Sequence, residues 1–329
     1  MNIGLTYDLR QDYLDMGYSE EETAEFDKES TVEGIEKALS FLGHKTQRIG
    51  HIKNLVNALA VNKTWDMVFN ITEGLFGLAR EAQVPALLDA YEIPYVFSDA
   101  FTLAVTLDKG LTKTIVRNLG IPTADYFVLK SMDKIDKVNL TYPLFAKPVA
   151  EGTGKGINTN SKITDKKQLT KVCENLLKEY KQPVLIETFL SGNEFTVGIT
   201  GTGEDAKVVA VMEIILGEKA EAEIYSYSNK DNYEDRVSYK LACEENAKKC
   251  EEVALAVWKN LGCRDGGRVD VRMDAKGIVN FIEVNPLAGL NYLTSDLPIM
   301  CGLKNIPFND LIKDIMESAT KRYYVRRKI

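Results

Sequence analysis

The chain has 329 residues, which suggests two or three domains at roughly 150 residues per domain. Hydrophobic residues make up 45% of it and charged residues 27%, values typical of a globular protein with a sizeable core. The formal net charge of −7 gives no electrostatic support to a nucleic-acid partner, and two histidines argue against a histidine-based zinc site or a Ser–His–Asp site.

The first 98 residues alternate between short apolar runs and amphipathic segments. Residues 31–42 carry apolar side chains at helical spacing and are followed by Gly43, a residue typical of helix ends. Residues 8–28 are acidic and are predicted to be a loop or a solvated helix. The order of elements predicts an open α/β sheet in an N-terminal domain, residues 1–98. Its predicted strands are 1–7, 45–49, 65–71 and 94–97, and its predicted helices are 31–42 and 81–91.

Two further α+β subdomains are predicted, at residues 99–190 and 191–329. A single helix is expected at 102–119, with Asp108 and Lys109 inside it. Residues 221–239 lack periodicity and are expected to form a mobile loop. The remaining predicted elements are strands 125–129, 143–148, 183–189, 194–200 and 208–215, and helices 164–180, 244–261 and 305–322.

A glycine-rich turn follows Lys147. Gly152, Gly154 and Gly156 surround Thr153 and would let backbone N–H groups come close to an anion. The spacing is not that of a Walker A loop, and residues 157–158 are expected to continue as a strand. Such a hairpin loop can cover a triphosphate like a flap, although a plain flexible hairpin remains an alternative.

Residues 184–190 form an apolar strand that contains Glu187. Apolar walls and an extended backbone suit an adenine ring, and Glu187 or Glu194 could accept hydrogen bonds from ribose hydroxyls. Lys109 and Lys147 could neutralise phosphate charge. The alternatives are a glutamate at a sheet edge and ordinary solvated lysines.

Residues 266–290 predict a hairpin with metal-type ligands. Arg268 and Asp270 are two residues apart on one strand, and Glu283 and Asn285 are two apart on the next. Alternation places each pair on one face, and the hairpin sets the pairs opposite each other. Carboxylate and amide oxygens suit Mg²⁺, which usually shares substrate phosphates. The alternative is a pair of half-exposed strands with satisfied polar side chains.

Cysteine usage and the N-terminus indicate a compartment. The five cysteines form no C-x-x-C pair, which favours free thiols in a reducing environment. The chain begins with a predicted strand rather than a signal segment, and no apolar run approaches a membrane span. We therefore expect a cytoplasmic protein with small-molecule partners and no membrane or nucleic-acid partner.

Taken in order, these features resemble the ATP-grasp superfamily and, within it, the D-alanine–D-alanine ligase family. The resemblance covers nearly all of the chain. It implies an N-terminal open α/β domain followed by two α+β subdomains that sandwich ATP, and commonly a homodimer. The segments that carry it are Leu107-Asp108-Lys109 with Lys113, Gly120-Ile121-Pro122, 184–197, 267–270 and 283–289.

The resemblance also implies a role for individual residues. Asp270, Glu283 and Asn285 would hold two Mg²⁺ or Mn²⁺ ions, and Arg268 with the Gly289 N–H would stabilise an oxyanion. Lys230 would reach the γ-phosphate from the loop. The ATP-binding residues would be Lys109, Lys147, Gly152, Thr153, Gly154, Gly156, Glu187, Thr188, Phe189, Leu190 and Glu194. The implied reaction joins two amino acids through an acyl phosphate, with D-alanine and peptidoglycan precursors as the leading expectation.

The amino-acid sites depart from the family pattern. The N-terminal G-G-x-S-x-E is absent, so an acid of the Glu20–Glu25 run is a candidate to order the first substrate's amine. Glu81 is kept, which would place it in the first substrate's site as a catalytic and substrate-binding residue, but the neighbouring histidine is lost. The pair that grips the second substrate is replaced, with Thr294 or Ser295 as candidate donors. A ligase with another substrate pair, a non-catalytic ATP-binding protein and a dinucleotide-dependent oxidoreductase remain alternatives.

Overall fold

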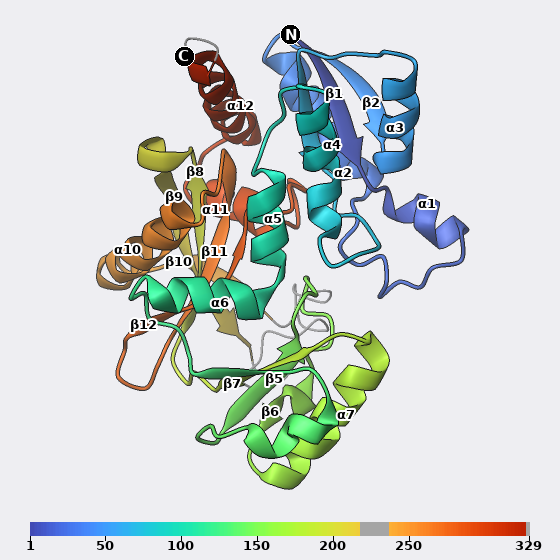
Figure 1. Ribbon diagram of the computed structural model, residues 1–329. Coiled ribbons are helices and arrows are strands. Elements are labelled where there is room, and N and C mark those ends of the chain that lie inside the picture. The colour runs from blue at the N-terminus through green and yellow to red at the C-terminus, as the bar shows by residue number, and fades with distance from the viewer. Residues whose placement is uncertain (218–236, 327–329) are drawn as a thin grey trace.

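The computed structural model describes residues 1–217 and 237–326, and they form a mixed α/β protein with three sheets (Figure 1). The sheet of the N-terminal region and the one near the C-terminus lie side by side, and the third lies below both. The fold class expected from the sequence is confirmed. None of the helices in the described part of the chain has both the length and the hydropathy of a membrane span.

The N-terminal sheet is parallel, with strand order β2-β1-β3. The predicted strand 94–97 is wrong: Tyr95 forms a single bridge to Val68, and Phe97 turns away with φ +77° and donates its N–H to Asp265. The elements are β1 (Asn2–Tyr7), α1 (Arg10–Asp15), α2 (Glu29–Phe41), β2 (Lys45–Gly50), α3 (Ile52–Ala60), β3 (Met67–Ile71), η1 (Arg80–Ala82) and α4 (Gln83–Ala90).

The helix predicted at 102–119 is in fact two helices, α5 (Ala100–Leu107) and α6 (Lys109–Asn118). Asp108 separates them with an extended ψ of 98°, and its side chain accepts the Leu111 N–H at 2.9 Å. An aspartate that caps a new helix outweighs the helical pattern around it. As a result Lys109 begins α6, and its backbone N–H donates to Val149 O at 3.2 Å, beside the glycine-rich turn.

The central sheet is antiparallel, with strand order β4-β7-β5-β6, and α7 packs on it. The glycine-rich turn lies between β5 and β6, which pair antiparallel as expected, but the strand expected at 157–158 is wrong. The chain there enters a 3-10 helix that Asn158 caps, and the strand that follows has only two residues. The elements are β4 (Tyr126–Leu129), η2 (Met132–Lys137), β5 (Leu144–Pro148), η3 (Thr159–Ser161), β6 (Lys162–Ile163), α7 (Lys166–Tyr180) and β7 (Val184–Thr188).

The C-terminal sheet is antiparallel, with strand order β10-β9-β8-β11-β12. Helix α10 covers one face through the fully buried Trp258. Of the predicted loop 221–239, residues 221–236 lie outside the described residues, while Tyr239 is in a strand. The elements are β8 (Glu194–Thr200), η4 (Gly203–Asp205), β9 (Lys207–Leu216), β10 (Val237–Leu241), α10 (Glu244–Asn260), β11 (Gly266–Met273), β12 (Val279–Asn285), α11 (Asp296–Leu303) and α12 (Phe308–Arg326).

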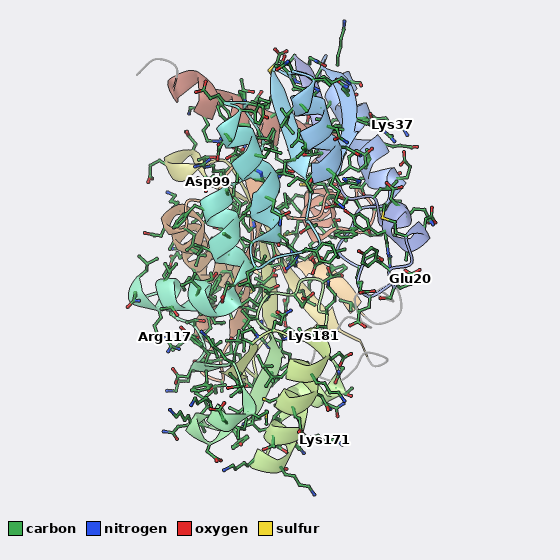
Figure 2. All side chains as sticks on the ribbon, turned by 45° about the vertical axis from the view of Figure 1, so that its right-hand side comes forward. Glu20, Lys37, Asp99, Arg117, Lys171 and Lys181 are labelled. Atoms are coloured by element: carbon green, nitrogen blue, oxygen red, sulfur yellow. The ribbon has the colours of Figure 1, made fainter. Side chains whose placement is uncertain are left out.

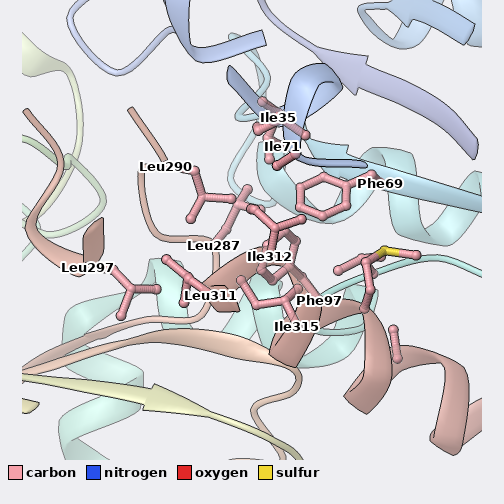
Figure 3. Packing of buried hydrophobic residues seen from close by; sticks show 14 of the residues in the cluster. Ile35, Phe69, Ile71, Phe97, Leu287, Leu290, Leu297, Leu311, Ile312 and Ile315 are labelled. Carbon is pink, nitrogen blue, oxygen red and sulfur yellow. The ribbon is translucent and has the colours of Figure 1, made fainter. Parts of the chain in front are cut away.

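One hydrophobic core connects the two ends of the chain. Ile35 of α2 and Phe69 of β3 pack with Ile312 of α12, and all three are fully buried (Figure 3). The last helix begins at Phe308 rather than at 305, because a residue that precedes a proline, here Ile306, disfavours the helical conformation. This shared core holds the N-terminal sheet against the C-terminal sheet and so fixes the position of the site between them.

Candidate active site

Two adjoining cavities lie where the three sheets meet. The larger has a volume of about 330 Å³ and is lined by residues from the N-terminal region, the glycine-rich turn and the end of β12. The smaller, about 100 Å³, lies between the central and C-terminal sheets. Lys109, Glu151, Arg268 and Glu283 line both. A substrate in one cavity would therefore meet a substrate in the other at these four side chains.

The β11–β12 ribbon has the register that its alternation predicts. Arg268 is paired with Asn285, and Asp270 with Glu283, across an antiparallel ladder. Asp270 is only 6% exposed: it forms an ion pair with Arg268, accepts Thr196 Oγ1–H at 2.9 Å and lies 3.3 Å from Asn285 Nδ2. The ribbon therefore brings two carboxylates and one amide together at the junction of the cavities.

The donor set fits a hard divalent cation. In residues 1–217 and 237–326 no group of three His, Cys, Asp or Glu side chains is placed to hold a metal. The ribbon instead offers two carboxylates and one amide. Mg²⁺ typically takes one or two carboxylates and completes its shell with water and phosphate oxygens. Asp270, Glu283 and Asn285 could supply such a partial shell.

Buried lysines surround the acidic end of the smaller cavity. Lys147 Nζ lies 3.4 Å from Glu187 and 3.7 Å from Glu283, and Lys109 Nζ lies 3.6 Å from Glu283. Burial works to lower the pKa of Lys147, but Glu187 and Glu283 outweigh it and the net pKa is raised. Both predicted lysines thus lie beside the ribbon, where a polyphosphate would need cations.

Lys113 is a participant that the sequence indicated only through its motif. Its side chain is 1% exposed, and its ammonium lies 2.6 Å from Glu187 and donates to Thr123 Oγ1 and the Phe281 carbonyl. Burial lowers its pKa, partly opposed by Glu187. Glu187 is therefore held between two lysines, and Lys113 fixes the end of β7 against β12.

The walls of the smaller cavity combine an aromatic ring with cations. The Phe189 ring faces Lys162 Nζ at 4.5 Å and the Arg272 guanidinium at 4.9 Å. Glu194 lies 3.2 Å from Arg272, and Thr188 and Leu190 also line the cavity. An aromatic wall beside a carboxylate suits a flat heterocycle that carries a sugar.

The glycine-rich turn forms the edge between the cavities. Gly152 and Thr153 line the larger one and Gly154 the smaller, whereas a Cβ on Gly156 would meet Pro148 at 2.6 Å, so Gly156 serves packing. Thr153 and Gly154 have φ of +53° and +75°. Lys109 Nζ donates to the Glu151 carbonyl at 2.6 Å and ties α6 to the turn.

The far wall of the larger cavity comes from the segment after β12. Gly289, Thr294 and Ser295 line it, and a Cβ on Gly289 would lie 2.7 Å from Ser295 Oγ. Arg268 lies between Asp270 and Asp296, and its guanidinium is 3.4 Å from the Asp296 carboxylate. Asp296 was not among the predicted site residues, because a lone acid that opens a helix carries no pattern of its own.

Four carboxylates from the N-terminal region line the same cavity: Glu81 and Glu25, which the sequence indicated, and Asp27 and Glu73, which it did not. Among the described residues, Asp27, Glu73 and Glu81 form no salt bridge. Burial raises the pKa of Asp27 to about 7 and that of Glu81 to about 7, and burial with the charges of Glu81 and Glu25 raises the pKa of Glu73 well above its usual range. Arg80 and Lys109 lie near enough to oppose this rise at Glu81, and Arg80 opposes it at Glu73, but burial prevails.

The acids of the Glu20–Glu25 run have other partners. Glu20 pairs with Arg10 at the periphery of the molecule (Figure 2), Glu21 accepts Tyr180 Oη–H, and Glu22 accepts from Ser19. Glu25 pairs with Arg80. The other predicted residue, Lys230, lies outside the described residues. No signal in the sequence distinguished Asp27 from the acids that precede it.

Comparisons with known proteins agree on one family. A family model described as D-ala D-ala ligase C-terminus matches residues 115–317. A D-alanine–D-alanine ligase of Aquifex aeolicus is 32% identical over 289 residues, covering 87% of this chain and 93% of that protein. A putative D-alanine–D-lactate ligase of Streptomyces coelicolor is 30% identical over 257 residues, covering 77% and 72%. A crystal structure of a Bacillus anthracis D-alanine–D-alanine ligase complexed with ATP has a TM-score of 0.74 at 24% identity, covering 100% and 99%.

Proposed function

Because the chain belongs to the D-alanine–D-alanine ligase family, it is an ATP-dependent ligase that forms a carbon–nitrogen bond, and we propose that it joins two amino acids through an acyl phosphate. D-Alanine is the substrate that we propose for both positions, as in synthesis of a cell-wall precursor. The observation that carries the proposal is the junction of the cavities, where Lys109 and Lys147 approach Glu283 at 3.6 and 3.7 Å.

The proposed reaction has two steps. The carboxylate of the first amino acid attacks the γ-phosphorus of ATP, the bond to the β-phosphate oxygen breaks, and an acyl phosphate and ADP result. The amine of the second amino acid then attacks the acyl carbon, loses a proton and expels phosphate. In such transfers the protein mainly positions the reactants and stabilises charge. Lys109, Lys147 and the glycine-rich turn would hold the phosphate chain in this scheme.

Asp270, Glu283 and Asn285 would hold Mg²⁺ or Mn²⁺, two ions by analogy with the family. When bound, such a cation neutralises charge on the transferring phosphoryl group. Arg268 lines both cavities, and we propose that it and the Gly289 N–H stabilise the oxyanion of the tetrahedral intermediate. The two adjoining cavities would then hold the amino acids and the nucleotide.

We propose that Asp27 and Glu73 bind the ammonium group of the first substrate. Asp27→Asn or Glu73→Gln should raise KM for that amino acid by about 10-fold or more, while KM for ATP changes little, because each removes a charge-assisted hydrogen bond from one cavity only. In the wild-type enzyme the same KM should fall as pH rises through 7, where Asp27 ionises. Initial-rate kinetics checks this. The exposed Glu20→Gln is the matched control, and equal changes in both KM values would contradict the assignment.

A second candidate is a ligase that uses a different second substrate. Asp296 lines the larger cavity beside Arg268, where the carboxylate of an incoming amino acid would meet a like charge. A second substrate without a carboxylate near its amine would avoid this repulsion. Asp296 therefore favours an alternative in which D-alanine is joined to an amine other than an amino acid with a free carboxylate.

A coupled assay of ADP release tests the proposed function. The purified protein, ATP and Mg²⁺ would be combined with D- and L-amino acids, singly and in pairs, and with D-alaninamide as the uncharged second substrate. We expect ADP release with D-alanine, with the dipeptide identified by mass spectrometry. Release with D-alanine only when D-alaninamide is present would favour the second candidate. No release with any amino acid would favour a non-catalytic ATP-binding protein.

Three further assignments belong to the same proposal. We propose a division into three parts, residues 1–98, 99–190 and 191–329, since all the strands of one sheet fall within each part. We also propose that the enzyme acts in the cytoplasm, where ATP and the amino acids are available, and that it forms a homodimer as related ligases commonly do.

A further inference from the structure

The acidic segment at residues 23–27 lies against the glycine-rich turn, more than a hundred residues away in sequence. Glu25, whose side chain is 8% exposed, makes the contact. Its Oε1 accepts the Gly152 N–H at 2.6 Å and lies 3.3 Å from Lys155 Nζ, and its Oε2 accepts from Arg80 Nη2 at 2.9 Å. Both oxygens are therefore used, and Glu25 does not compete with Asp27 for a substrate amine.

Arg80 extends the same connection. Its second guanidinium nitrogen, Nη1, donates to the Ala150 carbonyl at 2.9 Å, so one side chain contacts both Glu25 and the turn. Lys155 also pairs with Glu151 at 2.8 Å. Arg80 thus holds the turn at residue 150, and Glu25 holds it at residues 152 and 155. We call Glu25, Arg80 and Lys155 the clasp.

The clasp is ionic at neutral pH. Burial works to raise the pKa of Glu25, but Arg80 and Lys155 outweigh it, so that the net pKa is lowered. A buried carboxylate that keeps its charge loses much of its stabilisation when a partner is removed. The clasp therefore holds the turn by charge as well as by hydrogen bonds.

Gly152 shows how closely the two segments approach. A Cβ at this position would lie 2.8 Å from Glu25 Oε1, and the other nearby atoms also belong to Glu25. Gly152 has no left-handed φ that would itself require glycine. The need for glycine at this position thus comes from the presence of Glu25, which gives the contact a direct genetic test.

We propose that Glu25 is a positioning residue that fixes the glycine-rich turn over the phosphate chain of ATP, so that nucleotide affinity depends on the N-terminal region. The inference rests on the proposed role of the turn in ATP binding. It also connects the two substrates, because the segment that carries Glu25 carries Asp27 two residues later, in the amino-acid cavity.

Calorimetric binding of a non-hydrolysable ATP analogue with Mg²⁺, without amino acids, tests the proposal. Glu25→Ala should raise Kd by about 10- to 100-fold, since a charge-assisted network at the turn is lost, and Glu25→Gln should raise it by less. Glu21→Gln is the matched control: it lies in the same acidic run and its partner is Tyr180, so Kd should stay within about twofold. Thermal unfolding of each variant shows whether a raised Kd reflects loss of the fold or displacement of the glycine-rich turn in a folded protein.

A double-mutant cycle with Gly152→Ala completes the test. In the wild-type background the added Cβ meets Glu25 and should raise Kd, whereas in the Glu25→Ala background the space is open and the same change should add little. Additive effects, or an unchanged Kd in folded Glu25→Ala and Glu25→Gln, would overturn the inference. The binding experiment uses no amino acid and no turnover. A lack of ADP release with every amino acid would therefore contradict the proposed function without testing the role of Glu25.

Discussion

Asp270→Asn is expected to lower kcat by about three orders of magnitude, because it removes one of two carboxylates that would hold the metal at the phosphates. Asparagine keeps the shape of the side chain, and Thr196 can still donate to its oxygen. The fold should therefore persist, with a thermal midpoint close to that of the wild-type protein. The ADP-release assay measures the loss of turnover, and a thermal scan of the same sample checks that the fold persists.

Glu283→Gln should have a similar effect, because Glu283 lies opposite Asp270 on the ribbon. Asp274→Asn is the matched control: Asp274 is in the turn of the same ribbon, where its side chain accepts the N–H groups of Lys276 and Ile278 outside both cavities. It should leave turnover within about twofold. Near-wild-type turnover in Asp270→Asn would refute the metal assignment.

Lys113→Met is expected to destabilise the protein by about 3–5 kcal/mol, because it leaves the buried Glu187 without its nearer cation. Lys113 and Glu187 are 1% and 8% exposed and lie 2.6 Å apart. The change also removes the donor to Thr123 and to the Phe281 carbonyl, which connects α6 to β12. Urea denaturation followed by circular dichroism measures the effect.

Lys166→Met provides a control with an ion pair of the same length. Lys166 lies 2.6 Å from Asp136, but their side chains are 70% and 79% exposed, so solvent screens the pair. No measurable shift in the denaturation midpoint is expected for this variant. If Lys113→Met were equally silent, Lys147 alone would suffice to compensate Glu187, and the structural role given to Lys113 would be wrong.

The ribbon could be predicted from sequence because its geometry is local. Alternation along each strand and a turn between them determine which side chains face each other, and the observed register places Asp270 opposite Glu283. Local capping also explains where prediction failed. Asp108 starts a new helix inside a continuous helical pattern, which moves Lys109 to the first turn of α6 beside the glycine-rich turn.

The acids of the amino-acid cavity could not be predicted in this way. Asp27 follows an irregular segment, and Glu73 follows β3, where Gly74 with φ +72° donates its N–H to Asp8 at 2.8 Å. Asp27 and Glu73 come into one cavity only because segments distant in sequence pack together, and such packing produces no periodic pattern in the sequence. The acidic run suggested that one of its members orders the amine, but partners elsewhere occupy Glu20 to Glu25, and Asp27 lies just beyond it.

A crystal structure with ADP and Mn²⁺, recorded at a wavelength where manganese scatters anomalously, tests the central claim most directly. We expect an anomalous peak between the phosphates and the ribbon, with oxygens of Asp270, Glu283 and Asn285 at about 2.1 Å, as for other small divalent cations. A peak elsewhere, or these three side chains turned away from the phosphates, would contradict it.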